Sequence, residues 1–225
     1  MSMVMMENEP IQTGQILESV DVKATLKGLL SEVSVTQVYI NNDNENIEAV
    51  YTIPLPMDAM LLELKVNLND EQLIGVVKAK SKAEQDYESA IDEGDSAVLL
   101  EYAGDGLYTL NVGNLMPGET AQVTFRYAQL HTWQGDNLRF YFPTTISPRY
   151  GDPFAAGLAP HQIPEVSIAA DNQFSFELEV SGQLLECDFE CPSHPIKVSR
   201  EQQSLKFSLS GEQAFMDRDL VVQFK

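Results

Sequence analysis

The stretch SVDVKATLKGLLSEVSVTQVYI, residues 19–40, decides the fold of this chain. Apolar residues such as Val20, Val22 and Leu26 alternate with polar ones. The alternation resumes after Gly28 and continues to the end of the stretch. Successive side chains of a strand point to opposite faces, so an alternating run buries one face and exposes the other. The stretch therefore predicts two half-buried β-strands joined by a turn at Gly28.

The same pattern recurs through the rest of the chain. Further strands are predicted at 47–53, 61–66, 72–77, 97–102 and 107–112, and in the segments EVSIAA, FSFELEVSG, SLKFSLSG and DLVVQF. Between them, MPGE at Met116–Glu119 has Pro and Gly at the positions that a type II turn prefers. A series of short strands separated by turns predicts a mainly β fold, which we expect to be an antiparallel β-sandwich. The length of 225 residues suits one large domain or two small ones.

One helix is predicted inside this β pattern, at SKAEQDYESAIDEG, residues 81–94. Ser81 and Glu84 have the spacing of a capping box, which places the N-cap at Ser81, and Gly94 is a C-terminal stop. The apolar side chains of this helix form one narrow stripe, which consists of Ala83, Tyr87, Ala90 and Ile91. We expect a helix of about residues 81–93 that packs on the sheets, with Tyr87 as its main anchor.

Three acidic residues, Glu84, Glu88 and Asp92, recur at every fourth position of this helix. They share one face, where like charges weaken the helix by about 0.2–0.5 kcal/mol per pair. The face is either a solvated surface, a docking face for a basic partner, or a catalytic site. Catalysis needs carboxylates that face each other across a cleft in different environments. The spacing therefore favours a solvated surface, with docking as the alternative.

The chain is strongly acidic, with 34 Asp and Glu against 14 Lys and Arg and a formal net charge of -20. Such a field repels phosphate backbones and anionic lipid headgroups, so we expect neither nucleic acid nor direct membrane contact. The opening residues MSMVMMENEP lack the basic and apolar regions of a signal peptide, and no later run has the length of a membrane span. These features favour a cytoplasmic location but leave the compartment open.

Two acid-rich turns, at residues 43–48 and 92–95, raise the question of cation binding. The segment NNDNENIE has oxygen-bearing side chains at alternate positions. It lacks the glycine at position six and the glutamate at position twelve of an EF-hand, so we expect a β-turn. A cation-dependent adhesion or carbohydrate-binding module, using these turns and aromatic side chains such as Trp133, is the alternative function.

The segment CDFECPSH places Cys187, Cys191 and His194 within eight residues, a grouping found in zinc sites. No second pair of ligands has the usual spacing elsewhere in the chain. In an extended strand the two sulfur atoms would be too far apart for a disulfide. We therefore expect two buried thiols, no metal site and no cofactor.

Sequence motifs of enzymes are missing. The chain has no G-x-S-x-G, G-x-x-x-x-G-K or G-x-G-x-x-G segment, and its three histidines lie in loop-like surroundings without an obvious Ser or Cys partner. A hydrolase would need two carboxylates that converge in a cleft. We expect no enzyme activity and assign no catalytic residue.

Five segments follow one another in a fixed order: VYTIPLPMDA, KSKAEQDYESAIDEGDSAVLLE, LYTLNVGNLMPGE, VTFRY and FPTTISPRYGDP. Together they resemble the VIT domain, named for vault protein and inter-alpha-trypsin inhibitor, over residues 13–153. The motif A-x-x-x-Y-x-x-A before Gly94 and a Leu-Leu-Glu strand is similar to the bacterial branch of that family. The resemblance implies that the helix is a structural crossover packed on a β-sandwich, and it implies no active site.

The later segments CPSHPI and DRDLVVQF resemble the part of such proteins that leads into a von Willebrand factor A domain. The D-x-S-x-S metal-adhesion motif of that domain is absent from this sequence, so metal-dependent binding would belong to the A domain. The resemblance implies the N-terminal part of a longer protein. We expect a tail at 1–13, a VIT-like sandwich at 14–153, and further strands at 154–225 that complete or extend it.

The function implied by the resemblance is a non-catalytic scaffold or protein-interaction module that supports or presents the A domain. Its partner would be another protein or an adjacent domain of the same polypeptide, and the oligomeric state stays open. We expect contacts at Glu84, Glu88 and Asp92 of the helix. We also expect them in the Pro- and Gly-rich loop at 147–164, which contains Arg149 and Tyr150.

Overall fold

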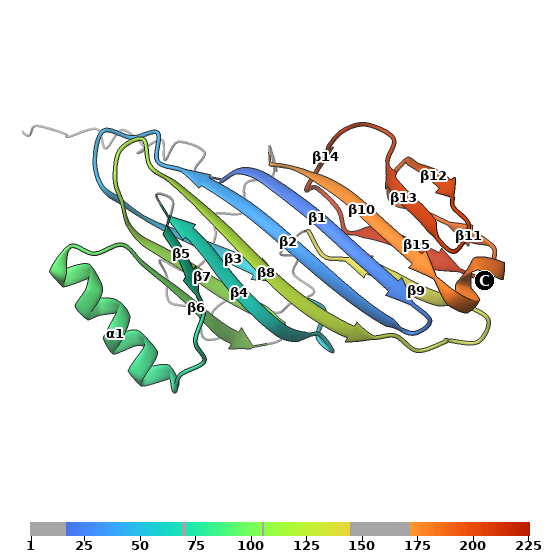
Figure 1. Cartoon of the computed structure of the whole chain (residues 1–225), viewed down its shortest axis with the longest axis horizontal. Helices are drawn as coiled ribbons and strands as arrows, with labels where there is room; N and C mark the ends of the chain where they lie inside the picture. The colour runs from blue at the N-terminus through green and yellow to red at the C-terminus, as the bar shows by residue number, and fades with distance from the viewer. Residues whose placement is uncertain (1–16, 69–70, 105, 145–171) are drawn as a thin grey trace, which may run out of the picture.

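The computed structural model describes residues 17–68, 71–104, 106–144 and 172–225, with the backbone alone at 48–52, 71 and 103. Figure 1 shows that strands dominate this part of the chain. The strands before the helix are β1 (Leu17–Lys27), β2 (Leu30–Ile40), β3 (Ile47–Pro54), β4 (Met60–Leu68) and β5 (Glu71–Ile74). Then follow α1 (Lys80–Glu93), β6 (Ala97–Gly104), β7 (Leu107–Leu115), β8 (Thr120–Leu130) and β9 (Leu138–Phe142). The last elements are β10 (Gln173–Ser181), the 3-10 helix η3 (Gly182–Glu186), β11 (Phe189–Glu190), β12 (Ile196–Arg200), β13 (Leu205–Leu209), β14 (Ala214–Phe215) and β15 (Leu220–Phe224).

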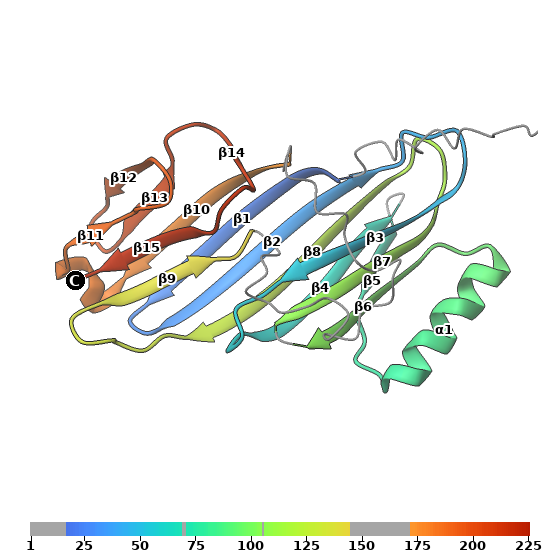
Figure 2. The same ribbon diagram turned by 180° about the vertical axis from the view of Figure 1, so that it is seen from behind.

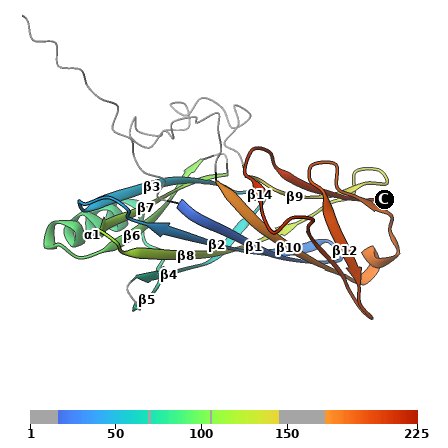
Figure 3. The ribbon, with the colours of Figure 1, turned by 90° about the horizontal axis from the view of Figure 1, so that it is seen from above.

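The strands form two layers. A nine-stranded sheet has the order β12-β13-β10-β1-β2-β8-β4-β5, and β14 pairs with β10 beside this path. Two three-stranded sheets, β3-β7-β6 and β11-β15-β9, lie against one face of it, as the view from behind in Figure 2 shows. Figure 3 shows the same two layers from above. The prediction of a mainly β fold with a helix near 81–93 is confirmed within the described residues.

The core lies between the layers and follows the alternation in the sequence. On β1, Val22 and Leu26 are fully buried, whereas Lys23 between them is exposed. Phenylalanine rings fill the half of the core formed with β11-β15-β9. The ring centroids of Phe140 and Phe176 are 6.1 Å apart, and those of Phe142 and Phe174 are also 6.1 Å apart. Each fully buried ring of this size contributes about 1.5–3 kcal/mol through the apolar surface it removes from water.

The expectation of an antiparallel sandwich is wrong for one strand pair. β1 and β10 run parallel, from Val20 beside Phe174 to Lys27 beside Ser181. A tight hairpin makes neighbouring strands antiparallel, but these two strands are far apart in sequence, so no short turn sets their direction. One sheet therefore contains strands from both sides of the predicted boundary at 153 and 154. That boundary, the predicted tail and the predicted strand EVSIAA lie outside the described residues.

Strand β5 is shorter than the predicted run to Val77. It ends at Ile74, and the N–H of Gly75 donates the last hydrogen bond of this edge to the carbonyl oxygen of Leu64, at 2.8 Å. A Cβ at Gly75 would lie 2.9 Å from the Cβ of Leu64, so the close approach needs glycine. The chain then leaves the sheet for α1.

Two histidines have serine neighbours that the sequence did not reveal. His131 is buried, with its Nε2 2.8 Å from the hydroxyl of Ser31 and its Nδ1 3.1 Å from the carbonyl oxygen of Arg139. His194 is also buried, and its Nδ1 is 3.0 Å from the hydroxyl of Ser193. Ser31 is fully buried, so no substrate reaches its hydroxyl and the pair with His131 is structural.

We expect the protein to lose stability as the pH falls through the ordinary histidine value of 6.5. Burial lowers the pKa of His131, and burial together with the charge of Arg218 lowers that of His194. The unfolded chain therefore binds more protons near pH 6 than the folded chain does, and acidification favours unfolding. Urea midpoints at pH 7.5, 6.5 and 5.5 measure the effect.

Acidification also reduces the net charge of -20 and its self-repulsion, so the control is a variant that lacks both histidines. The double variant His131→Asn with His194→Asn is expected to show a smaller loss of stability over the same pH range. An equal loss in the variant and the parent would refute the assignment to these two side chains.

Candidate interaction surface around helix α1

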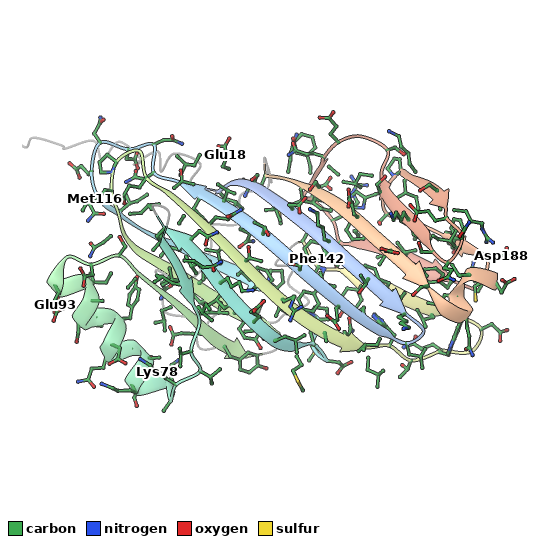
Figure 4. All side chains as sticks on the ribbon, in the orientation of Figure 1. Glu18, Lys78, Glu93, Met116, Phe142 and Asp188 are labelled. Atoms are coloured by element: carbon green, nitrogen blue, oxygen red, sulfur yellow. The ribbon has the colours of Figure 1, made fainter. Side chains whose placement is uncertain are left out.

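Helix α1 lies at one end of the elongated molecule, and the C-terminus lies at the other (Figure 1). Figure 4 labels Lys78 just before the helix and Glu93 in its last turn. The helix packs against β6 and β7. Val112 of β7 points into the core, so its neighbour Gly113 faces the opposite side, toward α1.

The helix agrees with the predicted range of about 81–93, but the N-cap lies two residues before the predicted Ser81, and the capping box does not form. The helix begins at Lys80, with Ala79 as its N-cap in an extended conformation and no side-chain capping bond. The N–H groups of Lys82 and Ala83 donate to the carbonyl oxygen of Ala79. Ser81 therefore lies inside the first turn. At the other end the prediction is confirmed, since Gly94 is the C-cap with a left-handed φ of 86°.

The position of α1 is determined by a glycine under its apolar stripe. Tyr87 is the buried side chain of the helix, and Ile91 lies beside it at its edge. A Cβ added to Gly113 would lie 2.3 Å from Cδ1 of Ile91 and 2.6 Å from the hydroxyl of Tyr87. The two side chains thus occupy the space that any other residue at this position of β7 would fill.

Asn114 ties the C-terminal end of the helix to β7. It has a φ of 53°, the left-handed region that asparagine tolerates better than most residues. Its side-chain amide donates to the carbonyl oxygens of Ile91 (3.1 Å) and Asp95 (3.0 Å). Its side-chain oxygen accepts a hydrogen bond from Asn46 at 3.0 Å. Sequence reasoning missed both Gly113 and Asn114, although a Gly-Asn pair at the end of a predicted strand was a signal for a special backbone conformation.

The three acidic residues of the predicted docking face differ in their surroundings. Glu84 forms an ion pair with Lys80 at 3.8 Å, whereas Glu88 and Asp92 are exposed. Arg149 and Tyr150, the other two residues of the predicted interaction surface, lie outside the described residues. The predicted acidic stripe therefore includes a compensated charge at its N-terminal end.

A fourth acid of the helix lies between two lysines. Asp86 is 2.6 Å from the ammonium of Lys78 and 2.8 Å from that of Lys82. These hydrogen bonds lower the pKa of Asp86 below its usual value. Water screens exposed pairs of this kind, so they orient the connector to the helix more than they stabilise it.

Two buried acceptor oxygens lie on the same side of β6 and β7 as Gly113. Glu101 pairs in register with Thr109 of β7, and Leu99 pairs with Asn111. Oε1 of Glu101 and Oδ1 of Asn111 are buried without a hydrogen-bond donor. The ammonium of Lys80 is 3.4 Å from Oε1, an ion pair that lacks hydrogen-bond geometry. A buried acceptor without a donor costs about 1–3 kcal/mol relative to a satisfied one.

The acid-rich turn at 43–48 is organised by the side chain of Asn41. Its amide donates to the carbonyl oxygens of Glu45 (2.8 Å) and Leu115 (2.7 Å), and its oxygen accepts from the N–H of Asp43 (2.8 Å). These bonds hold a bend at residues 43–45 between β2 and β3, where the sequence predicts a β-turn. Over the described ranges, no group of three or more His, Cys, Asp or Glu side chains is placed to hold a metal ion.

The two cysteines are not joined by a disulfide, and neither is fully buried. The expectation of two buried thiols is therefore wrong in its degree of burial. Cys187 follows η3, and Cys191 follows the two-residue strand β11, and both side chains are partly buried against the core. Sγ of Cys191 is 3.7 Å from the hydroxyl of Ser193.

Apolar side chains are exposed where β4 and β5 end the large sheet. Val77 is 100% exposed, and Val76 and Ile74 are 74% and 65% exposed. Further exposed apolar side chains here are Met57, Met60, Leu62 and Leu73. We call these seven residues the β4–β5 edge. β5 pairs with β4 only from Lys65 to Leu68, so in the described part of the chain no strand covers the first half of β4 on this side.

The outer face of the large sheet has a groove of about 780 Å³. Its lining contains four basic side chains, Lys23, Arg126, Lys197 and Lys206, and three acidic ones, Glu32, Glu177 and Glu179. Arg126 is paired with Glu32 at 3.9 Å. The groove thus offers mixed and partly paired charges rather than a field of one sign.

Helix length and hydropathy give no membrane-spanning candidate among the described residues.

Comparison with known proteins identifies the first part of the chain. Residues 17–127 match the family model of the Vault protein inter-alpha-trypsin (VIT) domain. Human von Willebrand factor A domain-containing protein 5A is 33% identical over 139 residues, which are 60% of this chain and 17% of that protein. Human protein mono-ADP-ribosyltransferase PARP4 is 30% identical over 132 residues, 59% of this chain and 8% of that protein. A von Willebrand factor A domain-containing protein of Dictyostelium discoideum is 36% identical over 112 residues, 48% of this chain and 12% of that protein.

The chain thus spans 17% or less of the length of these relatives. They come from human and Dictyostelium, so the expected bacterial branch stays a prediction. Among solved structures, an M1 zinc metallopeptidase from Deinococcus radiodurans matches 92% of this chain and 41% of its own chain, with 10% identity and a TM-score of 0.45. That similarity is too low to carry an inference about function. Through residues 17–127, this chain belongs to the VIT domain family.

Proposed function

We propose that this chain is a non-catalytic module that binds protein, and that it supports or presents a von Willebrand factor A domain. The observation that carries the proposal is the VIT match, shared with relatives that are named for a von Willebrand factor A domain. Those relatives are much longer than this chain, so a VIT domain occurs in them beside other domains. Contacts between domains of one polypeptide are typically 600–1,500 Å² and more polar than permanent interfaces.

The β4–β5 edge is the surface that we assign to this contact. Soluble monomers rarely leave several large apolar side chains exposed together, and such groups mark interaction sites. Val76 and Val77 are adjacent and highly exposed, so burying them against a partner gains apolar contact without breaking existing packing. The open side of β4 also offers backbone groups to an added strand.

Calorimetric titration of this chain with the purified A domain of the human relative tests the proposal. We expect saturable binding, and we expect the double variant Val76→Asp with Val77→Asp to weaken it at least about tenfold, because the charges would be buried in the contact. The melting temperature should stay unchanged, since both side chains are exposed.

The matched control is Phe215→Asp, which also places a carboxylate at an exposed apolar position but on β14, away from β4 and β5. It should bind like the parent chain. An absence of binding by the parent chain would contradict the proposed function. Equal weakening by Phe215→Asp would contradict only the assignment to the β4–β5 edge.

A further inference from the structure

Helix α1 carries its charges in the order that opposes its own dipole. Lys80 and Lys82 occupy its first turn, and Asp92 and Glu93 its last. The first turn has no acidic residue and the last turn has no basic one. The N-terminal end of a helix is partly positive and the C-terminal end partly negative, so charges in this order destabilise both ends.

The N-terminal end also lacks a cap. Ala79 provides no side-chain acceptor, so the N–H groups that begin the helix receive no side-chain capping bond. An isolated helix of 14 residues is marginal in water even with favourable caps. Hence α1 persists through its contacts with β6 and β7 rather than through its own propensity.

The contacts of α1 with β6 and β7 centre on one buried side chain, and they cover a buried oxygen that lacks a hydrogen-bond donor. Tyr87 is the buried side chain of the helix, and Ile91 beside it is half-buried. On the strand side, Oδ1 of Asn111 is buried without a donor, and Oε1 of Glu101 has the ammonium of Lys80 at 3.4 Å but no hydrogen bond. Exposure of these oxygens to water would restore their hydrogen bonds.

The segments that join α1 to the sheets are largely exposed. Residues 75–79, 94 and 95 are exposed, whereas Ser96 is half-buried and donates a hydrogen bond to the carbonyl oxygen of Asn114, so a displacement of the helix disturbs little buried contact within them. Among the described strands, β6 pairs with β7 alone and is an edge strand beside the helix. Local opening of a weakly held element, without unfolding of the rest, is common in native proteins.

We propose that α1 is a reversibly docked helix. In a local opening it leaves β6 and β7, loses its helical structure, and uncovers Leu99, Glu101 and the edge of β6, while the two-layer sandwich stays folded. Tyr87, Ile91, the two hydrogen bonds from Asn114 and the ion pair of Lys80 with Glu101 hold the closed form. The charge order of the helix and the unsatisfied oxygen of Asn111 favour the open form. The inference stands independently of the proposed function.

Hydrogen exchange of the whole chain, measured by mass spectrometry in native buffer, tests the proposal. Amides at 84–93 are expected to have protection factors at least about a hundredfold lower than those of β2 and β8. Their exchange should be insensitive to low urea concentrations, because a local opening exposes little surface. Protection in α1 equal to that in β2 and β8 would overturn the proposal, since the helix would then open only when the whole protein unfolds.

Two variants test the cause. Asp92→Lys with Glu93→Lys places positive charge in the last turn, which suits the partly negative C-terminal end of the helix. The change leaves Gly113, Tyr87 and Ile91 as they are, so protection in α1 should rise about three- to tenfold. Asn114→Gly removes the hydrogen bonds of the closed form without straining the left-handed backbone, so protection in α1 should fall while that of β2 and β8 stays the same. The control, Asp136→Lys with Glu212→Lys, makes the same change in net charge at exposed positions elsewhere. An equal effect of the control on α1 would overturn the role of the charge order.

Discussion

Replacing Phe174 with alanine is expected to lower the free energy of unfolding by about 3–5 kcal/mol. Phe174 is fully buried on β10, and its ring contacts His194 edge-on at a centroid distance of 5.6 Å. It also lies beside Phe142 of β9, so it joins the large sheet to the second layer. Truncation removes the transferred apolar surface and leaves a cavity that the paired strands around it cannot fill.

Urea unfolding followed by circular dichroism and by the fluorescence of Trp133 measures this loss. Because β10 pairs with β1, we expect both signals to shift together in one transition. Phe215→Ala is the matched control, since Phe215 is 52% exposed on β14 and its register partner Gln173 belongs to β10. It should change stability by no more than about 0.5 kcal/mol. A separate transition for residues 172–225 would show that the two parts do not share one cooperative core.

Replacing Gly113 with alanine is expected to cost about 1–3 kcal/mol, through the helix rather than through the strand. Gly113 does not have a positive φ, so alanine fits the backbone of β7. The new Cβ would instead collide with Ile91 and Tyr87, whose nearest atoms are 2.3 and 2.6 Å from it. Because α1 can undock to avoid the collision, the loss cannot exceed the free energy that docks it. Circular dichroism and chemical unfolding of the variant measure the loss.

A double-mutant cycle with Ile91→Ala isolates this contact. Removing Cδ1 of Ile91 makes room for the added methyl group, so the double variant should lose at least about 0.5 kcal/mol less than the sum of the two single losses. Gly211→Ala is the control, since its Cβ would meet nothing closer than the carbonyl oxygen of Gln213 at 3.3 Å. Additive losses would place the role of Gly113 in the strand instead of under the helix.

The local elements of this protein were readable from its sequence because each depends on near neighbours in the chain. The alternation at Val20, Val22 and Leu26 predicted β1 and its buried face. The turn at Met116–Glu119 forms as predicted, with a φ of 77° at Gly118 and a hydrogen bond of 3.0 Å from the N–H of Glu119 to the carbonyl oxygen of Met116. The apolar stripe with Tyr87 at its centre, and the stop at Gly94, followed from helical spacing and from the φ that glycine permits.

The start of α1 required the tertiary structure. Lys80 contacts Glu101 of β6, and Lys78 contacts Asp86, so packing against the sheet and the connector places the first turn one residue before Ser81. The contact of Gly113 with α1 also required the tertiary structure, since a glycine in a strand does not reveal which side chain lies over it.

The sequence by itself determined the strands with a clear alternation, such as β1 and β2, their buried faces and the end of the helix, but it did not predict β9 or β12. The tertiary structure alone decided that β1 and β10 are parallel neighbours, that Ser31 meets His131, and that α1 rests on Gly113. An alternating pattern specifies that a face must be covered but not which distant segment covers it. That choice depends on how the two layers pack as a whole, because strands that are far apart in sequence have no turn to set their partner or direction.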